Sequence, residues 1–68
     1  MDRVHYNVSG VLNNSTKTQV KNALDKIEGI QEVCVDIGRS SIEVAFNDSA
    51  NEAEVRSCIE QTGFSIKN

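Results

Sequence analysis

Hydrophobic and polar residues alternate near the start of the chain and then change period. Every second residue is apolar from Val4 to Val8, which predicts a strand with one buried face. The next apolar residues recur at helical spacing and predict one stripe of a helix: Val20, Ala23, Leu24 and Ile27. Gly29 is expected to end this helix, because glycine readily takes the left-handed conformation found after helix ends. A second β-rich run follows, with these apolar residues: Ile30, Val33, Val35 and Ile37.

The second half of the chain repeats this plan. Alternating residues from Ile42 to Phe46 predict a third strand. The helical spacing of the first half returns in a second stripe: Val55, Cys58, Ile59 and Thr62. Gly63 is expected to end this helix, and residues 64–66 to form a last short strand. Gly38 suits a hairpin at 37–40, and the polar run 47–49 suits the start of the second helix.

Each half therefore reads as strand, helix, strand. A single helix cannot bury its apolar stripe alone, so we expect both helices on one face of a four-stranded sheet. Right-handed crossovers then predict an α+β, ferredoxin-like βαββαβ sandwich with antiparallel strand order 4-1-3-2. Its other sheet face is expected to be open to solvent. We expect one domain over residues 1–68.

Composition narrows the function classes. The net charge of −3, with seven Lys and Arg among ten acids, argues against nucleic acid as a partner. The predicted open face also lacks the aromatic platform that RNA-binding sheets use. No run approaches the ~20 apolar residues of a membrane span, and the N-terminus has no secretory pattern, so we expect a cytoplasmic protein. Whether it is a whole protein or an excised domain stays open.

Several short segments, taken in order and spacing, resemble a known family. They are Val8-Ser9-Gly10-Val11, the helix and exit turn over 20–30, Val33-Cys34-Val35-Asp36, and Gly63-Phe64. Together they are similar to the heavy-metal-associated (HMA) domains of copper chaperones and of metal-pumping ATPases. The resemblance covers nearly the whole chain and implies the same ferredoxin-like fold and a place among heavy-metal transport proteins.

The resemblance also implies a metal loop, Gly-Met-x-Cys-x-x-Cys, in which two thiolates grip a soft ion such as Cu(I). Counting from Gly10, those cysteine positions are Asn13 and Thr16, and Val11 stands at the buried Met position. An amide oxygen and a hydroxyl are hard, neutral and weak ligands. We therefore expect a degenerate site that holds neither metal nor another cofactor. Residues 13–15 are good helix caps, worth ~1 kcal/mol, which by itself explains their types.

The two cysteines stand elsewhere. Alternation places Cys34 on the open sheet face, whereas Cys58 lies in the second helical stripe, so they are not expected to converge on a metal or form a disulfide. His5 shares the open face with Cys34, but the central third strand should separate them. A site shared between two copies through Cys34 is an alternative route to metal binding.

Leu12 suggests a docking surface. Its family counterpart is usually a small polar residue at the loop tip, so a leucine there would add an apolar contact to the surface that family members use to dock. Two arrangements stay open: an exposed apolar spot, or a Leu12 folded back on Phe64 as ordinary packing. The candidate docking residues are Leu12, Asn13, Asn14, Lys17 and Phe64. The resemblance implies a metal-transport ATPase domain or a chaperone-like protein as partner, or self-association.

The function that the sequence favours is a non-catalytic interaction or regulatory module related to metallochaperones. The alternative is a working heavy-metal carrier that uses other ligands or a partner-shared site. An enzyme is not expected, because acylphosphatase-type chemistry on this fold needs a loop arginine, and Arg3, Arg39 and Arg56 all fall away from residues 10–16.

Overall fold

The computed structural model describes residues 2–10 and 12–67. Its elements follow in the order β1 (Asp2–Ser9), α1 (Asn14–Asp25), β2 (Ile30–Asp36), β3 (Ser41–Phe46), α2 (Glu52–Gln61) and β4 (Ser65–Ile66). This is the predicted βαββαβ arrangement. None of the helices in the described ranges combines the length and apolar content needed to cross a bilayer.

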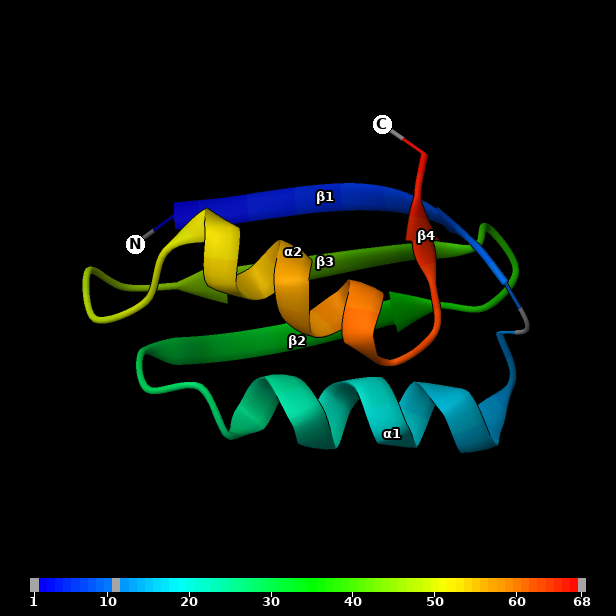
Figure 1. Cartoon of the computed structure of the whole chain (residues 1–68), viewed down its shortest axis with the longest axis horizontal. Coiled ribbons are helices and arrows are strands. Elements are labelled where there is room, and N and C mark those ends of the chain that lie inside the picture. The colour runs from blue at the N-terminus through cyan, green and yellow to red at the C-terminus, as the bar shows by residue number, and fades with distance from the viewer. Residues whose placement is uncertain (1, 11, 68) are drawn as a thin grey trace.

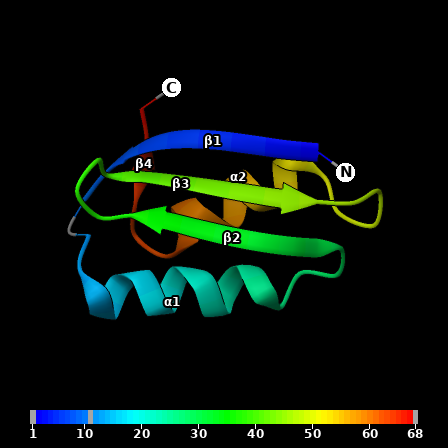
Figure 2. The ribbon, with the colours of Figure 1, turned by 180° about the vertical axis from the view of Figure 1, so that it is seen from behind.

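The four strands form one antiparallel sheet in the order β2-β3-β1-β4, which confirms the predicted order. Tyr6 pairs with Ile42 across β1 and β3, and Val8 pairs with Ile66 across β1 and β4. In Figure 1, α2 crosses in front of the strands and α1 runs alongside β2. Figure 2 shows the molecule from behind, where no helix covers β1, β3 or β2.

One mostly aliphatic core joins the helices to the covered face of the sheet. Each helix contributes two fully buried residues from its predicted stripe, Val20 and Leu24 in α1 and Val55 and Ile59 in α2. Burying each such side chain stabilises the folded state by about 1.5–3 kcal/mol. The remaining buried members of the cluster come from the strands and the turns: Tyr6, Val8, Val33, Ile42, Val44, Phe46, Ala50 and Phe64.

The first helix ends earlier than its apolar pattern predicts. It stops at Asp25, and Ile27 lies in the following turn, where its backbone N–H bonds the carbonyl of Leu24. The placement of Ile27 on the helix, and of the helix end at Gly29, was therefore wrong. Ile27 is nevertheless half-buried against the core, because the tight turn carries it back over the same face. Gly29 has the expected left-handed backbone, with φ of +99°.

Two turns also differ in detail from the expectation. In the β2–β3 hairpin the left-handed residue is Ser40, with φ of +52°, and not Gly38. Before α2, the Asn47 side chain accepts a hydrogen bond from the backbone N–H of Ser49 and closes a turn, while Asn51 is the residue that caps the helix. The polar run 47–49 thus prepares the helix start without capping it.

Candidate functional site

The loop between β1 and α1 begins with a close backbone approach. Gly10 has φ of +132°, and a Cβ added there would lie 2.9 Å from Cδ1 of the Phe64 ring. Only glycine fits both the backbone conformation and the space. The Gly10–Phe64 contact therefore ties the start of this loop to the segment between α2 and β4.

Asn13 and Thr16 form the N-terminal cap of α1. The Oδ1 atom of Asn13 accepts hydrogen bonds from the backbone N–H groups of Ser15, at 2.9 Å, and Thr16, at 3.0 Å. In return the Thr16 Oγ1 accepts a hydrogen bond from the backbone N–H of Asn13, at 2.8 Å. This reciprocal pattern is a capping box, in which each side chain satisfies an otherwise unpaired backbone donor.

The capping box engages both oxygens that stand where the resemblance implies metal-binding thiolates. To coordinate an ion, either oxygen would give up hydrogen bonds with the helix start. The described residues contain no group of three or more His, Cys, Asp or Glu side chains able to hold a metal ion. Val11, predicted to fill the buried Met position, lies outside the described residues.

The other predicted docking residues gather around this loop. Asn13 and Asn14 are exposed and Lys17 is half-buried. Leu12 is half-buried and packs against the core, whereas Phe64 is 5% exposed and belongs to that core. Of the two arrangements considered for Leu12, the structure has the one in which it packs back. The docking role of these residues stays a prediction.

Sequence reasoning missed the large apolar residue that is exposed. Among the described residues, Ile37 alone is an exposed large hydrophobic residue, with 36% of its surface accessible. It continues the apolar alternation of β2 and was placed in the hairpin, and neither feature indicated that it is exposed. The strand ends one residue earlier, at Asp36, and the hairpin carries Ile37 outward.

The two cysteines lie apart, as expected. Cys34 is exposed on β2 and Cys58 is half-buried on α2. On the open face, Glu43 of β3 pairs with His5 on one side and with Cys34 on the other, so a full strand separates the imidazole from the thiol. Burial raises the pKa of the Cys58 thiol, an effect that nearby Lys26 partly opposes.

Arg3 links three strands on the open face. Its guanidinium contacts Glu43 of β3 at 2.9 Å and Glu32 of β2 at 3.2 Å. The hydrogen bond with Glu43 is the main cause that raises the pKa of Arg3. All three side chains are about half exposed, so each pair contributes little stability. The sequence places them on one face but does not reveal their register.

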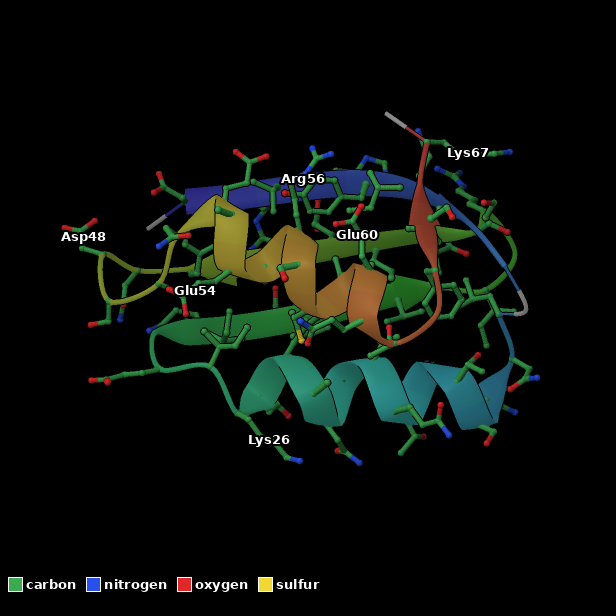
Figure 3. The ribbon with its side chains drawn as sticks, viewed as in Figure 1. Lys26, Asp48, Glu54, Arg56, Glu60 and Lys67 are labelled. Carbon is green, nitrogen blue, oxygen red and sulfur yellow. The ribbon has the colours of Figure 1, made fainter. Side chains whose placement is uncertain are left out.

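A second polar contact fastens α2 to β1. The Tyr6 hydroxyl donates a hydrogen bond of 2.9 Å to a carboxylate oxygen of Glu52. The guanidinium of Arg56 lies 5.7 Å from the centre of the Tyr6 ring, and Figure 3 shows Arg56 on the side of α2 that faces β1. Burial, and then the bond to Glu52, raise the pKa of Tyr6. The cluster holds the start of α2 in place.

No protein-family model and no curated protein sequence matches the chain. Solved structures do. The CopZ metallochaperone superposes with a TM-score of 0.88 at 24% identity, covering 96% of this chain and 98% of CopZ. A copper binding domain from HMA7, a P-type ATPase, superposes with a TM-score of 0.86 at 22% identity, covering 100% of this chain and 96% of that domain. Oxidized MerP from Ralstonia metallidurans CH34 superposes with a TM-score of 0.83 at 24% identity, covering 98% of this chain and 97% of MerP.

The chain therefore has the fold of these proteins over nearly its whole length. The ferredoxin-like fold that the resemblance implied is thereby confirmed.

Proposed function

We propose that this chain is a heavy-metal-associated-type domain that does not carry metal in its loop and works as a non-catalytic interaction or regulatory module in metal handling. One observation carries the proposal. The loop positions that the resemblance assigns to metal-binding thiolates hold Asn13 and Thr16, and these two side chains form a capping box.

The chemistry of these two residues opposes metal capture. Cu(I) prefers soft thiolate ligands, whereas a neutral amide oxygen and a hydroxyl are hard donors. Both oxygens are also hydrogen-bonded to backbone N–H groups, so coordination would remove a cap worth about 1 kcal/mol. The loop is thus built to start a helix.

The arginines support a non-enzymatic role. Arg3 binds Glu32 and Glu43, Arg39 lies with Asp36 in the β2–β3 hairpin, and Arg56 lies over Tyr6. None of these guanidinium groups belongs to the loop after β1, where a phosphate-gripping arginine would act on this fold. Arg39 does lie at the same end of the molecule, in one hollow with Lys17, where its acidic neighbour is Asp36.

The loop end is the proposed docking surface. Leu12, Asn13, Asn14 and Lys17 are its accessible residues, and Phe64, predicted to belong to it, is buried in the core and can only support it from beneath. The partner we propose is a metal-transport ATPase domain or a chaperone-like protein, since one structural neighbour is a copper binding domain of a P-type ATPase. By occupying such a partner, the module would regulate or compete with a metal-loaded domain.

Charge is distributed unevenly between the two ends of the molecule. The loop-end half holds Lys17, Arg39 and Lys67, together with Asp36. At the opposite end Arg3 and Lys26 are outnumbered by acids: Asp2, Asp25, Glu28, Asp48, Glu52 and Glu54. Figure 3 shows Lys67 above β4, and Asp48 and Glu54 at the far end. This asymmetry would orient the loop end toward an acidic partner and raise the association rate more than the affinity.

The metal part of the proposal is tested by Cu(I) competition. The reduced protein is titrated with Cu(I) in the presence of a chromogenic chelator, and we expect no complex to survive. A one-to-one complex that resists the chelator would contradict the proposal. If that complex disappears in a Cys34→Ser variant, the alternative of a carrier using Cys34 is correct.

The docking part is tested by cross-linked capture from cells of the source organism. Wild-type protein, Leu12→Asp and a control, Ala53→Asp, are compared after their folding is verified by circular dichroism. Ala53 is exposed on α2, near the opposite end. We expect Leu12→Asp to lose partners that the control retains. Identical partner sets for all three proteins would count against docking through the loop.

A further inference from the structure

A shallow hollow of about 550 Å³ opens on the uncovered face of the sheet, beside the β2–β3 hairpin. It shares Lys17 with the docking loop proposed above, and its other lining residues lie outside that loop. Residues from three strands, the hairpin and the first turns of α1 line it, among them His5, Lys17, Cys34, Ile37, Arg39 and Glu43. No helix covers the strands on this side (Figure 2).

The carboxylates that line the hollow already have cationic partners. Glu43 is paired with Arg3 at 2.9 Å. Asp36 lies 3.8 Å from the Arg39 guanidinium and accepts a hydrogen bond of 3.1 Å from the backbone N–H of Arg39. Each of these two acids therefore already has a cationic neighbour, and Arg3 is shared with Glu32.

Lys17 is different. Its ammonium has no ion-pair partner within residues 2–10 and 12–67, although its side chain is half-buried at the rim of the hollow. An ammonium group without a counter-ion attracts an approaching anion. The hollow thus has one unpaired positive group.

Ile37 supplies an apolar contact in the same hollow. It is 36% exposed, and it is the large hydrophobic residue that the described part of the chain leaves open to solvent. Covering the exposed part of such a side chain is favourable, by about 25 cal/mol for each Å² removed from water. A fitting ligand therefore carries both an anionic and an apolar group.

We propose that this hollow binds an acidic peptide segment of a partner protein. A carboxylate of the segment pairs with Lys17, and a neighbouring apolar side chain covers Ile37. A small free anion would use only the first of these contacts. Lys17 belongs to both this hollow and the docking loop, whereas Ile37 belongs to the hollow alone, so Ile37→Ser tests this proposal without altering the docking loop.

The test uses nuclear magnetic resonance with ¹⁵N-labelled protein and two capped hexapeptides, one of alternating Glu and Leu and one of alternating Lys and Leu. The Glu–Leu peptide should cause saturable shifts at Cys34, Ile37 and Ser41, and the Lys–Leu peptide should not. We expect Lys17→Glu to weaken binding about fivefold, because a partly exposed ion pair is lost. Ile37→Ser should weaken it as well.

Lys26→Glu is the matched control. It makes the same charge change just beyond the other end of α1, where Figure 3 shows Lys26 pointing away from the molecule. Equal weakening by Lys17→Glu and Lys26→Glu would show that only net charge matters and would overturn the proposal. So would absent or unsaturable shifts, shifts confined to residues 12–16, or self-association without peptide. If Lys17→Glu fails to fold, Lys17→Gln replaces it, with a smaller expected loss.

Discussion

Asn13 and Thr16 hydrogen-bond each other's backbone N–H groups at the start of α1, at 3.0 and 2.8 Å. The spacing of these residues is that of a metal-binding Cys pair in the family the chain resembles. The same two positions lie at the helix cap and in the first turn, so polar side chains there readily become helix caps. The same two side chains therefore stabilise the start of α1 and determine which ligand atoms the loop offers to a metal.

Removing either member of the capping box should destabilise the protein. We expect Asn13→Ala and Thr16→Ala each to lower the free energy of unfolding by about 0.5–2 kcal/mol. That corresponds to several degrees in Tm for a domain of this size. The double variant should lose less than the sum, because the two side chains act as a unit. Asn14→Ala, at an exposed neighbouring position, is the control; an equal loss there would contradict a specific capping role.

Restoring thiols should restore soft-metal chemistry. We expect the Asn13→Cys/Thr16→Cys double variant to stay folded and to bind Cu(I), because two thiolates at this spacing converge on one ion. The measurement is the same chelator competition, with each single Cys variant as control. A folded double variant without gained affinity would show that the loop is aligned incorrectly with the family motif.

Gly10 should tolerate no side chain. Gly10→Ala places a methyl group 2.9 Å from the Phe64 ring at φ of +132°, so we expect a loss of about 1–3 kcal/mol in urea unfolding. Gly38→Ala is the matched control, because its nearest atom would be an Asp36 carboxylate oxygen at 3.5 Å and its φ is not positive. Comparable losses at the two glycines would refute the close-approach argument.

Tyr6 should make the stability fall at alkaline pH. Its pKa is raised in the folded state above the ordinary value of 10.0, chiefly by burial. The folded state therefore holds the proton more tightly, and this stabilisation is complete below pH 10 and is lost as the pH rises further. We expect Tyr6→Phe to cost about 1 kcal/mol at pH 7, from the lost bond to Glu52.

The same variant should also lose less stability than wild type when the pH is raised above about 10. Urea unfolding of both proteins across this range measures the difference. Parallel pH profiles would show that Tyr6 does not cause the effect.

The two thiols should react at different rates. Cys34 is exposed, whereas burial raises the pKa of Cys58 and lowers its thiolate fraction. We expect an alkylating reagent at pH 8 to label Cys34 first, as followed by mass spectrometry of peptides. In urea both thiols should react alike. Equal rates in the folded protein would contradict the half-buried position of Cys58.

The periodicity of apolar residues was enough to predict the architecture. Period-2 runs and the helical stripes predicted the six elements, and the crossover rules then left the strand order that the structure shows. The residue types at positions 13–15 were enough to predict a helix cap, because the preference for such residues is local, but the part that Thr16 plays in the capping box came from the structure. These features depend on neighbours in sequence.

Other features were decided by contacts between distant segments. Only the fold brings Arg3 to Glu32 and Glu43, because strand register sets which side chains meet. Likewise Leu12 packs against the core while Ile37 stays exposed, although both are apolar residues beside a strand end. Hydrophobicity is the same for both; what differs is whether the folded chain presents an apolar surface within reach, and that is a property of tertiary packing.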